Sequence, residues 1–229
     1  MRIGFFGGSF DPPHLGHRAL ACLAADQLHL ERVLLAPVGR QPLKHGDAAP
    51  FADRVAMLEL AIAGDPRLEV SLADAPMPDG EPNYTVDTLR RLRRELPAGA
   101  RLYCIMGADS FLTLGKWHDA VGLFAESDLV VGARPGFVLD HAALTLPPGV
   151  RVEGLAEDRP GCRGYTVQHP SGRSMLYLLP DLAEEVSATE IRTEHAEVDE
   201  RLNPAVTGYI RTHGLYRARI ANRNQNQGR

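Results

Sequence analysis

Short, uninterrupted apolar runs alternate with amphipathic helical patterns along most of this chain. The clearest run covers residues 102–106 and ends at Gly107, and similar runs cover 33–36 and 129–131. An apolar run without polar alternation is typical of a strand that is buried on both faces, as in a parallel sheet. Strands of this kind, each followed by a helix, form βαβ units. The pattern therefore predicts an α/β fold with a Rossmann-like, doubly wound parallel sheet.

The length of the chain, 229 residues, is compatible with one hydrophobic core, because single cores stop growing only beyond about 250 residues. We expect one domain over 1–216, with a small helical part at its C-terminal end and a flexible basic tail at 217–229. Residues 138–174 are rich in Pro and Gly with few periodic cues, and we interpret them as an insertion or lid. The other expected elements are strands at 3–6, 68–70 and 175–179 and helices at 15–28, 55–62, 86–96, near 187 and at 205–212.

Charge and cysteine content narrow the classes of partner and compartment. The net charge is −4 although residues 217–229 carry four arginines and no acid, so the body of the chain is acidic. A duplex-DNA binder gains affinity from a basic face, and we therefore expect no nucleic-acid partner.

Cys22, Cys104 and Cys162 form no C-x-x-C pair, which argues against a disulfide framework and favours a reducing, cytoplasmic setting. No apolar run approaches the ~20 residues of a membrane-spanning helix, so we expect no membrane partner. The sequence does not determine whether the protein forms a homo-oligomer.

The segment between the first strand and the first helix is the most informative part of the sequence. Residues 7–17 read GGSFDPPHLGH, with Gly7 and Gly8 at the strand end and Ser9 and Phe10 next. Glycines let the backbone approach a ligand, and a helix N-terminus offers unpaired N–H groups with a partial positive charge. The segment lacks both the G-x-G-x-x-G spacing of dinucleotide-binding dehydrogenases and the G-K-[ST] ending of a P-loop. We therefore predict a phosphate-binding loop of another type.

Two histidines lie at the start of the helix that follows this loop. His14 and His17 are three positions apart, so they lie on one side of the first turn, where imidazoles can donate to a phosphate. Two alternatives stay open from the residues alone. One is an ordinary capped helix start with surface histidines, and the other is a transition-metal site made by Asp11, His14 and His17.

A second helix start carries the sequence SATEIR over residues 187–192. Ser187 and Glu190 form an S-x-x-E capping box, which by itself indicates only that a helix begins here. Thr189 and Arg192 are three positions apart and therefore neighbours on the helix surface. Their hydroxyl and guanidinium, at another positive helix end, could hold a second phosphate.

The two motifs together resemble the nucleotidyltransferase superfamily with H-x-G-H and I-S-x-T-x-I-R signatures. Within it the chain is similar to the bacterial nicotinate-nucleotide adenylyltransferases, because shorter segments also match. These segments are PNYTVDTL at 82–89, GADSF at 107–111, KWH at 116–118 and ARPGF at 133–137. The resemblance covers 1–137 and 175–217, and it departs at QPLK (41–44), where Leu43 replaces a histidine of the family.

The resemblance implies roles for individual residues. His17 would lie nearest the reacting α-phosphorus, while Tyr84 and Thr85 would receive a pyridine carboxylate and Trp117 would stack on the ring. Taken alone, Trp117 has the alternative of an ordinary half-buried aromatic, and Arg134 could equally cap a turn. The implied catalytic residues are His14, His17, Lys44 and Arg192; the ATP-binding residues are Gly7, Gly8, Ser9, Phe10, Gly107, Asp109, Ser187 and Thr189; the acceptor-binding residues are Tyr84, Thr85, Trp117 and Arg134.

The function implied by the resemblance is transfer of AMP from ATP to nicotinate mononucleotide, giving nicotinate adenine dinucleotide and pyrophosphate. The attacking phosphate is already largely ionised at neutral pH, since its second pKa is about 6. Mg²⁺ is expected on the ATP phosphates, and no metal-ligating residue is assigned. Other hypotheses remain at this point: the same transfer to nicotinamide mononucleotide or phosphopantetheine, a non-catalytic nucleotide- or RNA-binding module, and a nicotinamide-dependent oxidoreductase.

Overall fold

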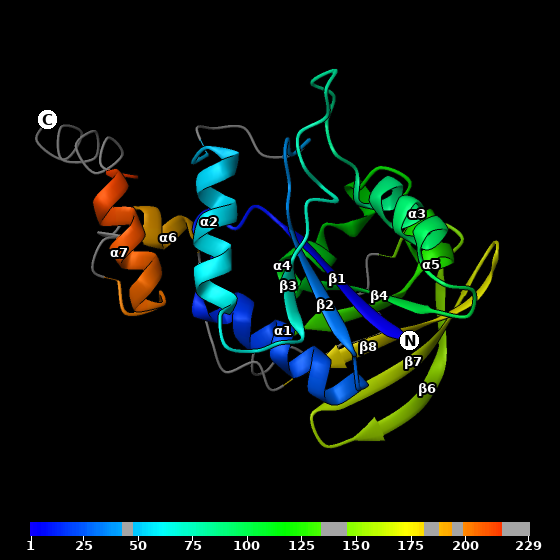
Figure 1. The fold of residues 1–229 in the computed structure, drawn as a ribbon. Coiled ribbons are helices and arrows are strands. Elements are labelled where there is room, and N and C mark those ends of the chain that lie inside the picture. Colours follow the sequence, from blue (N-terminus) through cyan, green and yellow to red (C-terminus); the bar gives the residue numbers. More distant parts are fainter. Residues whose placement is uncertain (43–47, 134–145, 181–187, 194–198, 217–229) are drawn as a thin grey trace, which may run out of the picture.

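A computed structural model describes residues 1–42, 48–133, 146–180, 188–193 and 199–216, which form an eight-stranded sheet covered by helices (Figure 1). The strand order is β3-β2-β1-β4-β5-β8-β7-β6. The strands are β1 (Arg2–Gly8), β2 (Arg32–Pro37), β3 (Leu68–Val70), β4 (Arg101–Gly107), β5 (Asp128–Gly132), β6 (Arg151–Arg159), β7 (Cys162–His169) and β8 (Gly172–Leu179). The helices are α1 (Leu15–Leu28), α2 (Phe51–Ile62), α3 (Thr85–Glu95), α4 (Ala108–Leu112), the 3-10 helix η1 (Leu114–Lys116), α5 (Ala120–Glu126), α6 (Ala188–Thr193) and α7 (Pro204–His213).

Six neighbouring strands, in the order β3-β2-β1-β4-β5-β8, run parallel, as the continuous apolar runs predict. From β1 the chain passes outward to β2 and β3, then returns to β4 on the other side of β1. The order therefore reverses between β1 and β4. In open α/β sheets, ligands bind outside the carboxyl ends of the strands at such a reversal point. The predicted Rossmann-like, doubly wound fold is confirmed, and its reversal point lies where β1 leads into the loop at 7–17.

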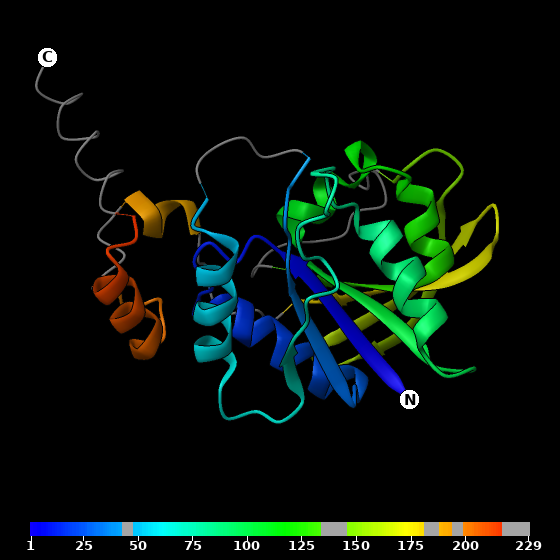
Figure 2. The ribbon, with the colours of Figure 1, turned by 45° about the horizontal axis from the view of Figure 1, so that its top comes forward.

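Alternate side chains of the strands enter two different cores. In β1, Phe5 packs with α3, α4 and α5 on one face of the sheet, whereas Phe6 packs with α1 and α2 on the other. Both phenylalanines are almost completely buried. Successive residues of a strand point to opposite faces, so a parallel strand between two helical layers must be apolar throughout. Figure 2 shows the sheet lying between the two groups of helices.

The segment 151–169 is where the structure adds most to the sequence-based expectation. It contains β6 and β7, which extend the sheet beyond β8 as antiparallel strands. The predicted sheet had only parallel strands, and these two were missed. Most residues of β6 are exposed or half-exposed, and its pairing with β7 shifts register after Val152 and Leu155. An exposed, irregular edge strand has no reason to carry an apolar run, so periodicity gives no signal for it.

The C-terminal helices form a separate small core against α2. Met57 and Ala61 of α2 pack with Ile191 of α6 and with Val206 and Ile210 of α7. Figure 1 shows α7 lying alongside α2. Asn203 caps α7 by accepting from the backbone N–H of Ala205 (2.9 Å), and Gly214 ends the helix with φ of 63°. The predicted helical C-terminal part is confirmed, and it lies against the helix that follows β2.

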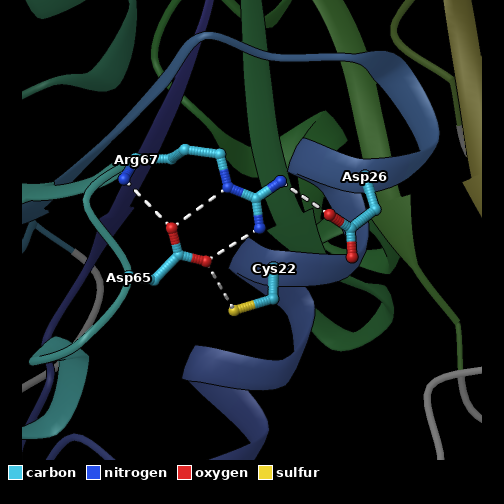
Figure 3. Close-up of polar contacts among 4 residues, drawn as sticks. All are labelled: Cys22, Asp26, Asp65 and Arg67. Carbon is cyan, nitrogen blue, oxygen red and sulfur yellow. Dashed lines mark hydrogen bonds and ion pairs between the residues drawn. The ribbon is translucent and has the colours of Figure 1, made fainter.

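An arginine ties the entry of β3 to α1 (Figure 3). The guanidinium of Arg67 donates to Asp65 from Nε (3.0 Å) and Nη2 (2.8 Å), and to Asp26 of α1 from Nη1 (2.6 Å). The Sγ of Cys22 lies 3.7 Å from Oδ2 of Asp65. Bonding by Arg67 lowers the pKa of Asp65 to about 2. This cluster lies outside the candidate site and joins α1 to the strand edge.

None of the helices in the described ranges is long and apolar enough to cross a membrane. All of the cysteines are free thiols; they are Cys22, Cys104 and Cys162.

Candidate active site

The loop at 7–17 begins at the carboxyl end of β1, next to the end of β4. Gly8 is the last residue of β1, and Gly107 is the last residue of β4. A Cβ on Gly107 would meet nothing within 4 Å, so space is open beside that strand end. A Cβ on Gly7 would lie 3.0 Å from the Phe5 ring, which leaves little room at this position. Phe10 has φ of 46° and a buried ring, so only its backbone can contribute to a ligand contact.

His17 is held in one orientation by its neighbours. The backbone N–H of His14 donates to Nδ1 of His17 (3.1 Å). The two imidazoles stack with centroids 3.6 Å apart, and the Phe10 ring meets the imidazole of His17 edge-on at 4.9 Å. Because Nδ1 accepts a hydrogen bond, the proton of the neutral imidazole is on Nε2. His17 is thus oriented as an Nε2–H donor on a packed aromatic support.

His14 is buried and lies near Asp199 and Arg201. The backbone N–H of Leu15 donates to the carbonyl of Arg201 (2.9 Å), which brings residues 199–201 to the start of α1. Burial and, to a smaller extent, the charge of Arg201 lower the pKa of His14 to about 4, against an opposing effect of Asp199. His14 is therefore neutral at physiological pH. A neutral imidazole can donate one hydrogen bond to a phosphate but does not add a positive charge.

The second motif reaches the first through Arg192. On α6, Nη2 of Arg192 donates to Oγ1 of Thr189 (3.1 Å), as their spacing on a helix predicts. Nη1 of Arg192 donates to the backbone carbonyl of Asp11 (2.5 Å). The structure therefore brings the Thr189–Arg192 pair to the loop, three residues before His14. Elements far apart in the sequence meet at the carboxyl end of β1.

Asp11 is the residue through which several segments contact the loop. Its side chain is only 6% exposed. Oδ1 accepts from the backbone N–H of Ala49 (3.1 Å) and from the hydroxyl of Tyr216 (2.7 Å), while Oδ2 lies 3.7 Å from Nη1 of Arg192. In the described part of the chain, no group of three or more His, Cys, Asp and Glu residues could hold a metal ion. The alternative of a metal site made by Asp11, His14 and His17 stays an untested hypothesis.

The expected acceptor residues lie on the side of the site formed by α3 and η1. Tyr84 precedes α3 and Thr85 is its first residue, while Trp117 directly follows η1. Tyr84 and Trp117 are half-buried against the same apolar core, and the ring of His118 lies 4.2 Å from that of Tyr84. The structure thus gathers Tyr84, Thr85 and Trp117 into one region of the molecule.

Asn83, which the sequence analysis did not single out, fixes the position of this region. Its Oδ1 accepts from the backbone N–H of Arg40 (3.0 Å), and its Nδ2 donates to the carbonyl of Ala75 (2.9 Å). The backbone N–H of Asn83 also donates to the carbonyl of Arg40 (3.0 Å). These bonds join the segments after β2 and β3 to the start of α3. The sequence placed Asn83 within the motif at 82–89 but gave no signal for these contacts.

A buried carboxyl links the acceptor side to β1. Asp74 is 2% exposed and accepts a hydrogen bond from the hydroxyl of Thr88 on α3. Its Oδ2 lies 3.5 Å from the position that a Cβ on Gly7 would occupy. Burial raises the pKa of Asp74, although the bond from Thr88 and the charge of Arg91 oppose this shift. The first turn of α3 is thereby anchored beside the end of β1.

Comparison with known proteins shows the family of this chain. Residues 5–194 match the sequence model of the cytidylyltransferase-like family. The chain is 40% identical over 221 residues to the probable nicotinate-nucleotide adenylyltransferase of Laribacter hongkongensis, covering 95% of this chain and 96% of that protein. It is 38% identical to a protein of the same name from Thermus thermophilus, covering 95% and 100%. The chain belongs to the nicotinate-nucleotide adenylyltransferase family.

Solved structures show the fold of this family at lower sequence identity. The nicotinic acid mononucleotide adenylyltransferase of Plasmodium falciparum complexed with NaAD is 18% identical, with a TM-score of 0.67 and coverage of 94% of this chain and 97% of that one. The same Plasmodium protein complexed with APC gives a TM-score of 0.66 over 94% and 96%. The architecture seen here is therefore that of adenylyltransferases that have been solved with nucleotides.

Several family positions are not placed by the structure. Lys44, Arg134 and Ser187 lie outside the described residues, as does Leu43 at the departure from the family pattern. Asp109 is described; it is exposed in the first turn of α4, directly after Gly107. The contact that connects the two motifs is the one between Arg192 and Asp11, and Tyr216 adds a bond to Asp11 for which the sequence gave no signal.

Proposed function

We propose that this protein transfers AMP from ATP to the phosphate of nicotinate mononucleotide, giving nicotinate adenine dinucleotide and pyrophosphate. The observation that carries the proposal is the bond from Arg192 to the loop of His14 and His17, because it puts the donors of both motifs at one strand end. Membership of the nicotinate-nucleotide adenylyltransferase family supports the choice of reaction.

The reaction needs positioning and charge stabilisation rather than a general base. A phosphate oxygen of nicotinate mononucleotide forms a bond to the α-phosphorus of ATP. The bond from that phosphorus to the oxygen bridging to the β-phosphate breaks, and its electron pair leaves on pyrophosphate. Because the attacking phosphate is largely ionised at neutral pH, no proton has to be removed from it. Donors placed where charge accumulates lower the barrier.

The site residues can supply the positioning and the charge stabilisation that the reaction needs. We assign the Nε2–H of His17 to the α-phosphate and the neutral imidazole of His14 to a second hydrogen bond there. Arg192 and Thr189 are assigned to the β- and γ-phosphates, where a guanidinium is the strongest donor. Backbone groups of 7–10, with Gly107 and Asp109, would line the nucleotide pocket. Lys44 and Ser187 are carried over from the family pattern as further phosphate contacts.

The acceptor is assigned to the region of α3 and η1. A helix N-terminus favours a negative group, so the start of α3 at Tyr84 and Thr85 suits a carboxylate better than an uncharged amide. Trp117 would stack on the pyridine ring, and Arg134 is assigned to the mononucleotide from the family pattern. This distinction between acid and amide supports nicotinate over nicotinamide mononucleotide.

Mg²⁺ is proposed to enter with ATP. The described residues offer no group of three or more His, Cys, Asp and Glu side chains for a metal. Mg²⁺ keeps several of its waters and is commonly bound through substrate phosphates with few protein ligands, so this donor set fits an ion carried by the triphosphate. When bound, it would neutralise charge on the departing pyrophosphate.

We also propose that residues 1–216 act as one domain and that the protein works in the cytoplasm. The free thiols support this compartment.

One assay tests both the reaction and the acceptor. The purified protein is incubated with ATP and Mg²⁺ plus nicotinate mononucleotide, nicotinamide mononucleotide or phosphopantetheine in separate reactions, and pyrophosphate is measured. We expect the nicotinate nucleotide to give the highest kcat/KM. Pyrophosphate release with another acceptor alone would assign a different substrate, and ATP binding without release for any acceptor would favour a non-catalytic nucleotide-binding module.

A further inference from the structure

We infer that Asp11 is a positioning residue of the transfer reaction, because its buried carboxylate sets Arg192 against the loop that carries His14 and His17. The inference rests on the proposed function and adds a residue to it. Asp11 would not touch the substrates; it would act through Arg192. Its contacts come from the segment before α2, from α6 and from the turn after α7.

The burial of Asp11 requires a set of partners, and the structure supplies them. A carboxylate withdrawn from water is costly unless it is paired and hydrogen-bonded. The two donors on Oδ1, from Ala49 and Tyr216, satisfy one oxygen, and the guanidinium of Arg192 faces the other. The same guanidinium is bonded to the loop carbonyl and to Thr189, so its plane is fixed from two sides. Its side chain remains 19% exposed, which leaves it accessible to a ligand.

A second arginine balances the charge of Asp11. Arg54 of α2 is 4% exposed and donates from Nη1 to the carbonyl of Ser9 (2.8 Å) and from Nε to that of Ala49 (3.1 Å). Burial lowers the pKa of Arg54, and the nearby charge of Asp11 raises it. The charge of one carboxylate thus acts on two guanidinium groups. The cluster keeps a net positive charge, and Arg192 can be held by Asp11 and still attract a triphosphate.

Tyr216 provides a way to disturb Asp11 without changing its charge. Its hydroxyl donates to Oδ1 of Asp11 across 205 positions of the chain. Tyr209 makes the same kind of bond from the same C-terminal part, to Oδ1 of Asp53 (2.8 Å), but Asp53 is not a neighbour of the loop in any described hydrogen bond. Tyr209→Phe is therefore a matched control for Tyr216→Phe. Each variant loses one hydrogen bond from a tyrosine to a carboxylate, but only the bond lost in Tyr216→Phe is made to the loop.

The decisive experiment is a double-mutant cycle of Asp11→Asn and Arg192→Ala. Asparagine keeps an acceptor oxygen for Ala49 and Tyr216 but replaces the oxygen that faces Arg192 with an amide NH₂. We expect Asp11→Asn to lower kcat for pyrophosphate release by about tenfold or more in the wild type, and by less than about twofold when Arg192 is already alanine. An equal loss in both backgrounds, or no loss in either, would overturn the inference.

Two further measurements separate a failure of the inference on Asp11 from a folding defect and from a failure of the proposed reaction. If Asp11→Asn does not fold, the tyrosine pair decides: Tyr216→Phe should lower kcat by about threefold or more through the weakened support of Asp11, whereas Tyr209→Phe should not. Equal kcat values for the two phenylalanine variants would then refute the role of Asp11. The cycle is also measured as the Kd for ATP by calorimetry. If the wild type releases no pyrophosphate, the proposed reaction fails, while coupling or additivity in these Kd values still decides for or against Asp11.

Discussion

The guanidinium of Arg192 donates to the backbone carbonyl of Asp11 at 2.5 Å, across 181 positions of the chain. This contact joins the short helix of the second motif to the loop of the first. It is possible because α6 and α7 pack against α2, and α2 follows the strand next to β1.

His17→Ala should lower kcat by about 10² or more, as expected when a donor to transition-state charge is lost. His17→Gln should retain more activity than alanine, because its amide N–H can reach the region of the former Nε2. The comparison is made by pyrophosphate release, with circular dichroism as the control for folding. Wild-type turnover in the alanine variant would refute the assignment of His17.

The stability of the protein should fall between about pH 6.5 and about pH 4. The pKa of His14 is lowered from 6.5 in the unfolded chain to about 4 in the folded protein, so the unfolded state binds the proton more readily in this window. The difference is worth up to about 3 kcal/mol for this group. It should be measured as the free energy of unfolding in urea at several pH values. In His14→Gln this part of the pH dependence should disappear; an unchanged profile would show that other groups cause it.

Asn83→Asp should weaken acceptor binding specifically. The substitution puts a carboxylate oxygen against the carbonyl of Ala75, where the amide now donates, and so displaces the start of α3. We expect KM for nicotinate mononucleotide to rise by about tenfold, with KM for ATP changed by less than about twofold. Steady-state kinetics with each substrate varied in turn provide the test. A parallel rise in both KM values would mean that Asn83 supports the whole site.

The thiol of Cys22 should react slowly with alkylating reagents, and substitution of Asp65 should make it react faster. Burial raises the pKa of Cys22, and the charge of Asp65 raises it further while Arg18 and Arg67 lower it. Asp65→Asn removes that opposing charge, so alkylation by iodoacetamide at pH 8 should become several-fold faster. Cys104 and Cys162 are buried and serve as internal controls in the mass spectra. No acceleration at Cys22 would show that access, not ionisation, limits its reaction.

The sequence predicts the parts of this molecule whose constraints are local. Buried parallel strands must be apolar on both faces, and for that reason β1, β2, β4, β5 and β8 are recognisable from their runs alone. The helix starts that carry His14 and Thr189 are likewise marked by glycines and by a capping pattern. The edge strand β6 is not recognisable, because most of its residues are solvent-exposed and no run is required.

The contacts that organise the candidate site are tertiary, and no local pattern encodes them. From the sequence, Asp11 could be considered only as a residue of the first motif and as a metal ligand in one alternative, yet Ala49, Arg192 and Tyr216 all bond to it. Asn83 shows the same limit, since its partners Arg40 and Ala75 follow two other strands. The motifs could be named in advance, whereas the contacts that hold them in place required the fold.

The measurement that tests the account most directly compares the affinities of ATP and AMP for the wild type and Arg192→Ala by calorimetry, with Tyr209→Phe as the control. If the two motifs hold one triphosphate, with His17 at the α-phosphate and Arg192 beyond it, the Kd for ATP should rise by about tenfold or more. The Kd for AMP, which has no β- or γ-phosphate, should change by less than about twofold. An equal loss for both nucleotides, or an unchanged Kd for ATP, would contradict the account.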